Sequence, residues 1–340
     1  MAEEGKLNRY KHLIFSNPID FPETSCLYSL ESIAVGTPYT ESLSSYLNRL
    51  AQEHCVTPQK LIMGEIAPTI LGDKYAPEIF SKNVSSLFGN SDAKPAINGM
   101  REMTRSLVDA LEKLTLRQDL RFLSCVTWKG IISDRGLFRQ YKAWCPLCFE
   151  TWRQARKLIY EPLLWSFREV DFCPEHQCEL CDRCPHCDSF QKAISDFSVP
   201  GYCSRCRHWL GKSDNTKSSL QEDFKQNHFI LQGIGDLIAL TPQLKHQPNL
   251  KSLKHKFKLI LFCFERAIHH DLGQYVVLIK LIEKLKIDLK QNYFKPINLT
   301  EIIIPVCQQA KISVSQLFEN NYENLAQILA QNIETDYKIL

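Results

Sequence analysis

Cysteine and histidine side chains gather in one segment of this sequence, at spacings that suit a metal ion. Nine of the 14 cysteines lie between Cys145 and Cys206. Two donors separated by two residues can bind one metal ion from a tight turn, and two such pairs complete a tetrahedron. Four pairs of this kind follow one another: Cys145 with Cys148, Cys173 with His176, Cys184 with Cys187, and Cys203 with Cys206.

Pairing these donors in sequence order predicts two closed metal sites, one of three cysteines and a histidine and one of four cysteines. Zinc suits both donor sets, and a site with four protein ligands keeps no position open for catalysis. We therefore expect two structural zinc ions. Binding of about 10–16 kcal/mol per ion would dominate the folding of so small a region. Five scattered cysteines are expected to be ordinary buried thiols: Cys26, Cys55, Cys125, Cys263 and Cys307.

Two further cysteines leave alternatives open. Cys178 and Cys181 extend the series into a C-x2-C-x2-C-x2-C run, which resembles the ligand run of an iron–sulfur cluster. The last spacer is too short for the ferredoxin pattern, however, and Asp188 stands where that pattern has proline. A third arrangement keeps zinc but lets Cys181 replace one ligand. Two equivalents of zinc in a colourless protein would favour the first arrangement over an iron–sulfur cluster.

Positive charge is concentrated around the first cysteine pair. Residues 121–168 contain nine basic and three acidic side chains, a net charge of +6 on a chain whose total is +3. Tyrosine and tryptophan are interleaved with these bases, a mixture that can contact nucleic-acid phosphates. Alternatively, the tryptophans pack small zinc-ribbon cores and the bases form a solvated face. The candidate nucleic-acid contacts here are Arg139, Lys142, Arg153, Arg156 and Lys157.

Residues 40–63, TESLSSYLNRLAQEHCVTPQKLIM, predict a helix-turn-helix. Thr40 can cap a first helix whose apolar face repeats at helical spacing. Thr57 can cap a second helix that has Pro58 at its first position. Gln59 and Lys60 are then the base-reading candidates, which is a thin set for sequence recognition. A protein-binding or purely structural helix pair remains an alternative. The apolar face of the first helix comprises Leu43, Leu47, Leu50 and Ala51.

A weaker helix-turn-helix candidate spans residues 299–320. Thr300 is the expected cap, residues 310–312 form the turn, and Ser313 begins the second helix. Pro305 weakens the pattern because proline in a helix interior removes a hydrogen bond and clashes with the preceding turn.

The chain as a whole predicts a mainly α fold in three parts. We expect an N-terminal helical domain with the helix-turn-helix (1–138), a tandem zinc-ribbon region (139–215) and a C-terminal helical domain (216–340). The polar stretch 211–228 reads as a linker, and apolar residues at helical spacing follow it. The N-terminus lacks the pattern of a secretory signal, and no apolar run has the roughly 18 residues of a membrane span. These features predict a cytoplasmic protein.

Catalytic motifs are missing from the sequence. Gly211-Lys212-Ser213 lacks the upstream glycine of a phosphate-binding loop, because Cys206 stands at that position. Neither G-x-S-x-G nor H-E-x-x-H occurs. We therefore expect a protein that is not an enzyme.

Two of these patterns together resemble the TniQ/TnsD family of transposon target selectors. The first is the helix sequence ESLSSYLNRLA at residues 41–51. The second is the double ribbon that runs from C-P-L-C at 145–148 through Trp165, C-P-E-H at 173–176 and C-P-H-C at 184–187 to Cys203 and Cys206. The resemblance covers residues 20–210. It implies zinc ligands at the eight paired positions and leaves Cys178 and Cys181 as departures from the pattern.

The resemblance also implies a function and partners. Members act as non-enzymatic adaptors that connect a target-recognition module to the AAA+ ATPase TnsC. Longer TnsD-like members read a DNA attachment site themselves, whereas shorter TniQ-like members of CRISPR-associated transposons dock on a Cascade-type effector with its guide RNA. With 340 residues, a modest charge and a thin recognition helix, this chain is more similar to the second group. The expected partners are a TnsC-like ATPase, a Cascade-type effector and target DNA in a prokaryotic cytoplasm, with no membrane.

Overall fold

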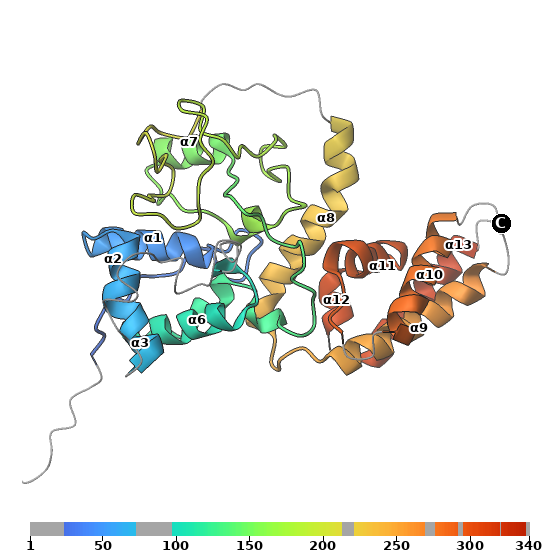
Figure 1. Cartoon of the computed structure of the whole chain (residues 1–340). Coiled ribbons are helices and arrows are strands. Elements are labelled where there is room, and N and C mark those ends of the chain that lie inside the picture. The colour runs from blue at the N-terminus through green and yellow to red at the C-terminus, as the bar shows by residue number, and fades with distance from the viewer. Residues whose placement is uncertain are drawn as a thin grey trace, which may run out of the picture.

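The computed structural model describes residues 24–72, 97–212, 221–268, 276–291, 295–319 and 321–337. Within these ranges the protein is mainly helical, as predicted, and β pairing is confined to isolated bridges. In Figure 1 a loop-rich region around α7 lies above the N-terminal group of helices, and the C-terminal group lies to the right, beyond α8. No described helix has both the length and the apolar character needed to cross a membrane.

The first helix of the N-terminal group, α1 (Leu43–Glu53), has the predicted apolar face. Its residues Leu43, Leu47 and Leu50 are fully buried. The cap is Ser42 rather than Thr40, because the Ser42 hydroxyl accepts the backbone N–H of Ser45 at 3.2 Å. Thr40 points elsewhere: its hydroxyl donates to backbone carbonyls of the preceding loop.

A short turn connects α1 to a second helical run made of α2 (Pro58–Leu61), η2 (Ile62–Ile66) and α3 (Ala67–Leu71). Thr57 caps this run as predicted, accepting the backbone N–H of Lys60. Pro68 cannot donate the next helical hydrogen bond, and its ring crowds the preceding turn. The chain widens into a π turn at this point, where the N–H of Ala67 bonds to the carbonyl of Ile62. Two helices therefore lie where the sequence places them; that they bind DNA stays a prediction.

The N-terminal helices share one hydrophobic core with α6 (Glu102–Thr115) and the 3₁₀ turn η5 (Leu120–Leu123). The α6 helix ends at Thr115. The next residue, Leu116, has the left-handed conformation (φ 55°) that is common after the end of a helix. The next 3₁₀ turn is η6 (Val126–Trp128). Its Trp128 packs in a different core, together with the C-terminal helices.

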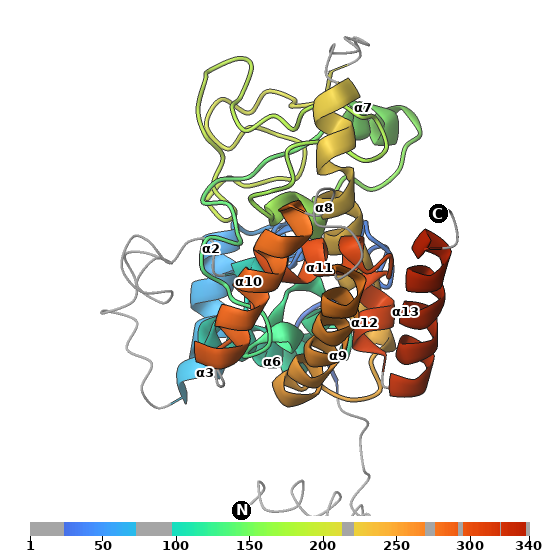
Figure 2. The ribbon, with the colours of Figure 1, turned by 90° about the vertical axis from the view of Figure 1, so that its right-hand side faces the viewer.

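The C-terminal part is helical, as predicted. Its long members are α8 (Gln221–Leu240), α9 (Leu250–Ile268), α10 (Val276–Gln291) and α13 (Tyr322–Tyr337). Figure 2 shows α9, α10 and α13 side by side. The predicted linker 211–228 is wrong in its second half because α8 already begins at Gln221. Glutamine, glutamate and lysine are good helix formers, so a polar run can extend a helix whose apolar part packs further along.

Shorter elements complete this part: η8 (Thr241–Gln243), η9 (Leu299–Ile303), α11 (Ile304–Gln309) and α12 (Val314–Phe318). Asn298, not Thr300, caps η9 by accepting the N–H of Glu301 at 2.9 Å. Pro305 is accommodated by a π turn, as Pro68 is. Ser313 begins α12 with a full capping box. The α12 helix spans only five residues, and its apolar side chains are buried, which argues against the second helix-turn-helix candidate as a DNA reader.

Trp128 connects the middle of the chain to the C-terminal helices. Its indole N–H donates to the Thr241 hydroxyl at 2.9 Å, and its ring meets Phe318 edge-on with centroids 4.7 Å apart. Residues 125–138 thus share a core with α8, α9 and α12. The division into domains at 138 and 215 stays a prediction.

Close packing between α8 and α11 gives a first testable prediction. A Cβ atom at Gly233 would lie 2.8 Å from Ile304 Cγ1. We expect Gly233→Ala to lower the free energy of unfolding by about 1–3 kcal/mol through overpacking. Gly64→Ala is the control: its Cβ meets nothing within 4 Å, so loss of a helical glycine should stabilise by up to about 1 kcal/mol. Urea titrations followed by circular dichroism measure both, and equal effects would contradict the packing argument.

Candidate metal centres

The first candidate centre brings together Cys145, Cys148, Cys173 and His176, whose donor atoms all lie within 4.8 Å of one another. The Sγ atoms of Cys148 and Cys173 are 3.5 Å apart, and Cys145 Sγ lies 3.6 Å from His176 Nδ1. Tetrahedral zinc with bonds of about 2.3 Å to sulfur and about 2.1 Å to nitrogen requires edges of about 3.8 and 3.6 Å. The donor set therefore fits a tetrahedral metal ion.

The second candidate centre consists of Cys184, Cys187, Cys203 and Cys206, again within 4.8 Å. The Sγ atoms of Cys184 and Cys206 are 3.7 Å apart, and those of Cys187 and Cys203 are 3.6 Å apart. All eight predicted ligands thus fall into the two groups that sequence order gives. Each group could hold one ion and supplies four protein donors, as closed structural sites do.

Local backbone geometry aims these donors. Cys145 is a candidate metal ligand and also the N-cap of α7 (Pro146–Gln154). As the cap, its sulfur accepts a hydrogen bond from the N–H of Cys148 at 3.3 Å. The other pairs sit on knuckle-shaped turns closed by a residue with positive φ. In the third pair, Asp188 (φ 52°) donates its N–H to the Cys184 carbonyl at 2.9 Å. Gln177 and Arg207 take the same left-handed conformation after their pairs.

At Cys203 and Cys173, hydrogen bonds favour the thiolate, the form of cysteine that binds metal. Burial alone would raise the pKa of Cys203. The backbone N–H groups of Cys206 and Arg205 point at its sulfur and outweigh burial, lowering the pKa to about 6. Hydrogen bonds to Cys145 and Cys148 likewise hold the pKa of Cys173 below its usual value.

The two additional cysteines lie differently. Cys178 Sγ is 3.6 Å from Cys145 Sγ, at the edge of the first centre, whereas Cys181 is exposed and belongs to neither group. The C-x2-C-x2-C-x2-C run does not converge on one point, because Cys184 and Cys187 meet Cys203 and Cys206 instead. Neither the iron–sulfur arrangement nor replacement of a ligand by Cys181 is formed.

Aromatic side chains fill the space between the centres. Trp144, Trp152 and Trp165 are buried in the core of the ribbon region, which we define as residues 144–210. Trp152 stacks on Tyr160 with centroids 4.7 Å apart. Gly201 (φ 82°) lies so close to the Trp209 ring that a Cβ would meet it at 2.4 Å. These tryptophans pack the ribbon core, the alternative that competed with nucleic-acid contact.

The structure separates the predicted nucleic-acid residues. Arg139 donates to the Phe167 carbonyl at 3.0 Å and to Asp171 at 2.7 Å. Lys142 pairs with Glu161 at 2.8 Å, and its side chain is only 13% exposed. Neither therefore lies on an open basic face; a sequence shows the charge but not the internal partner that uses it. The other candidates reach the surface to different degrees: Arg153 (bound to Glu150), Arg156, Lys157, Lys60 and the half-buried Gln59.

Sequence reasoning missed a set of stacked planar groups on the second centre. The Arg183 guanidinium lies 3.9 Å from the Phe190 ring centroid, and Arg207 lies 4.0 Å from that of Phe197. His186 and His208 are exposed and stack with centroids 4.3 Å apart. No spacing rule could have found these pairs, because the partners meet only after the knuckles have folded.

The helix sequence ESLSSYLNRLA at residues 41–51 contains a buried ion pair. Glu41, fully buried, pairs with Arg49 at 2.6 Å and accepts the Ser45 hydroxyl at 2.8 Å. Burial raises the pKa of Glu41, while Arg49 and Ser45 favour its carboxylate. The Glu41 carboxylate can therefore stay ionised in the interior only because Arg49 pairs with it, since an unpaired buried carboxylate is costly.

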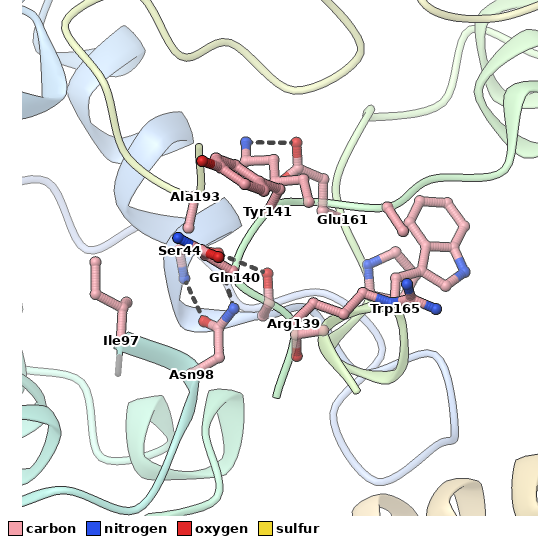
Figure 3. A pocket seen from close by; sticks show the side chains of 14 residues that line it. Ser44, Ile97, Asn98, Arg139, Gln140, Tyr141, Glu161, Trp165 and Ala193 are labelled. Atoms are coloured by element: carbon pink, nitrogen blue, oxygen red, sulfur yellow. Dashed lines mark hydrogen bonds and ion pairs between the residues drawn. The ribbon is translucent and has the colours of Figure 1, made fainter. Parts of the chain in front are cut away.

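The same segment connects α1 to the ribbon region. We call the contact between residues 40–42 and 161–163 the joint. Backbone N–H groups of Ser42 and Leu163 donate to the carbonyls of Glu161 and Thr40 at 2.9 and 2.7 Å. A small, partly open pocket of about 30 Å³ lies at the joint, where Asn98 bonds to Ser44 and Lys142 to Glu161 (Figure 3). Such a volume holds no more than about two water molecules, so the joint is a packed interface rather than a substrate site.

Comparison with known proteins agrees with this geometry. No curated protein matches the chain. The family model TniQ matches residues 32–180, a range that contains α1, the joint and the whole first metal centre. Over these residues, somewhat less than half of the chain, the protein is similar to the TniQ family.

Proposed function

We propose that this protein is a non-enzymatic adaptor in transposition. It links an RNA-guided, Cascade-type CRISPR effector to a TnsC-like AAA+ ATPase at the target DNA, in a prokaryotic cytoplasm. The match to TniQ carries the proposal. Two zinc ions at the two centres would be structural, holding the ribbon region in shape, because all four donors at each centre come from the protein.

The exposed face of the second helical run supports docking over independent reading of a DNA site. Its exposed residues are Lys60, Gly64 and Glu65, one base and one acid around a glycine. Base-specific contacts rely on arginine, lysine, asparagine and glutamine reaching the groove. A single lysine with a half-buried Gln59 offers little of that chemistry.

Binding to duplex DNA by the purified full-length protein tests the choice between adaptor and TnsD-like selector. The adaptor should bind weakly and without sequence preference, and it should bring TnsC to target DNA only in the presence of the effector. Nanomolar, sequence-selective binding at physiological salt would overturn the adaptor in favour of the selector. Nicking activity that survives purification would overturn both.

The turn after α7 is the contact that we propose for the DNA backbone. Arg156 and Lys157 are exposed there. Arg156→Ala/Lys157→Ala should weaken nonspecific duplex binding and make the slope of log K against log salt less negative by about 1.8, because two phosphate contacts are lost. Arg105→Ala/Lys113→Ala removes the same charge from the exposed side of α6 and serves as the control. Fluorescence anisotropy over a salt series measures both, and equal slopes would move the DNA contact elsewhere.

A further inference from the structure

A cavity of about 670 Å³ opens in the C-terminal helices, and no metal-binding residue lines it. It lies where η8, the loop after it, the first turns of α9 and the end of α12 meet, at the lower edge of the view in Figure 1. This volume is within the range of about 300–1,000 Å³ that is usual for ligand pockets. The cavity is therefore large enough to accept several side chains of a partner.

The floor of the cavity is apolar and fixed. Leu253, Leu317 and Phe318 are at least nine-tenths buried, and Leu244 is half-buried beside them. Phe318 packs edge-on against Trp128, with centroids 4.7 Å apart. Trp128 belongs to the large hydrophobic core of the C-terminal helices, so the floor is already in place before a ligand binds.

One wall of the cavity carries a buried cation. Lys256 is 2% exposed, and its ammonium donates to the Leu317 carbonyl at 2.7 Å and to the Glu319 carbonyl. These bonds hold the end of α12 against α9. Burial lowers the pKa of Lys256, while the Glu319 carboxylate raises it.

The rim of the cavity carries charges of both signs and is rich in amides. Lys245 and His246 are exposed, and Glu319 is the one acidic residue among those that line the cavity. Carboxamides can bond to the backbone of an extended peptide through both their oxygen and their nitrogen. Those on the rim belong to Gln243, Gln247, Asn249 and Asn321.

The sequence around the cavity has an unusual charge distribution. Residues 237–264 contain five lysines and two histidines but no aspartate or glutamate. The net charge of the whole chain is only +3, so this stretch alone exceeds it. Of these lysines, Lys245 and the buried Lys256 line the cavity, and the other three lie on α9 near it. Together they give this part of the chain a positive field, which attracts negatively charged partners.

We infer that this cavity is a docking site for an acidic segment of a partner protein. The segment places an apolar side chain on the half-buried Leu244 above the floor, while its carboxylates meet Lys245 and His246. A nucleic acid fits less well, because the described residues that line the cavity include no arginine and, as their one aromatic side chain, Phe318, which is 9% exposed. Bases need exposed rings to stack on, and phosphates need protruding cations. The site goes beyond the proposed function and does not depend on the metal centres.

Selection of short peptides from a random display library on the full-length protein tests this site. Enriched peptides should be net negative and contain leucine, isoleucine, phenylalanine or tryptophan. Synthetic copies should bind Lys245→Glu/His246→Glu at least about tenfold more weakly, a loss of about 1.4 kcal/mol. Gln247→Trp, which fills the mouth with a bulky ring, should weaken binding similarly. Lys113→Glu/Lys280→Glu makes a comparable change in charge on exposed positions of α6 and α10 and should bind normally.

The altered cavity residues are all exposed, so circular dichroism and unfolding midpoints should match those of the unaltered protein. Enrichment of peptides without acidic character would overturn the inference. So would peptides that bind the cavity variants and the unaltered protein equally, or a library that yields no binder. A single-stranded or duplex oligonucleotide that displaces the peptides, and whose own binding needs Lys245, would identify a nucleic-acid site instead.

Discussion

Cys184→Ser is expected to leave the protein with one equivalent of zinc instead of two and to unfold the second half of the ribbon region. A serine hydroxyl is a poor ligand for zinc, and the other three donors do not hold the ion well alone. Structural zinc supplies about 10–16 kcal/mol at such a site, which is comparable to the whole stability of a typical domain. Elemental analysis and limited proteolysis of residues 184–210 measure the two effects. Recruitment of partners should be lost as well.

Cys181→Ser is the matched control, because Cys181 is exposed and belongs to neither centre. It should keep both ions and the normal proteolysis pattern. Cys145→Ser should remove the ion of the first centre, unless Cys178, whose sulfur lies 3.6 Å from that of Cys145, replaces it. The double variant Cys145→Ser/Cys178→Ser separates these outcomes. A folded Cys184→Ser protein with two zinc equivalents would show that the ligand assignment is wrong.

Arg49→Met is expected to lower the free energy of unfolding by roughly 3–5 kcal/mol. The change leaves the Glu41 carboxylate buried without the guanidinium that lies 2.6 Å from it. Removing one partner of a buried ion pair costs more than the pair contributes, because the remaining charge has lost both water and its counter-ion. Chemical unfolding followed by tryptophan fluorescence gives the value. Glu41→Gln in the same background should recover part of the loss, since the charge is then gone.

Arg105→Met provides the comparison at the surface. Arg105 pairs with Asp109 at 3.1 Å, but both side chains are more than half exposed. Solvent already screens this pair, so its loss should cost no more than about 0.5 kcal/mol. If the two variants lose equal stability, the buried pair is not the element that holds the joint.

The composition of the two candidate metal centres could be predicted from the sequence because the pairs are local: two ligands three residues apart on a tight turn face the same point. That these groups bind metal stays a prediction. The apolar face of α1 was predictable for a similar reason, since Leu43, Leu47 and Leu50 repeat with the helix. Local patterns also placed Thr57 as a cap and the C-terminal helices as helices.

Contacts between segments that are distant in the sequence could not be predicted from sequence patterns. Cys26 and Cys55 were expected to be buried and are exposed, while Cys125 and Cys307 are buried as expected. Whether a thiol is covered depends on what packs over it, and composition does not show that. The use of Lys142 is another example, because its acidic partner Glu161 lies 19 residues away across the joint.

The backbone bonds between residues 40–42 and 161–163 have a consequence for geometry. Main-chain hydrogen bonds cannot be exchanged for other partners by a change of rotamer, so a hinge at this point would leave buried N–H and C=O groups unsatisfied. These bonds therefore oppose a hinge between α1 and the ribbon region at this point. If α1 and the ribbon region contact different partners, this connection fixes the distance between those partners.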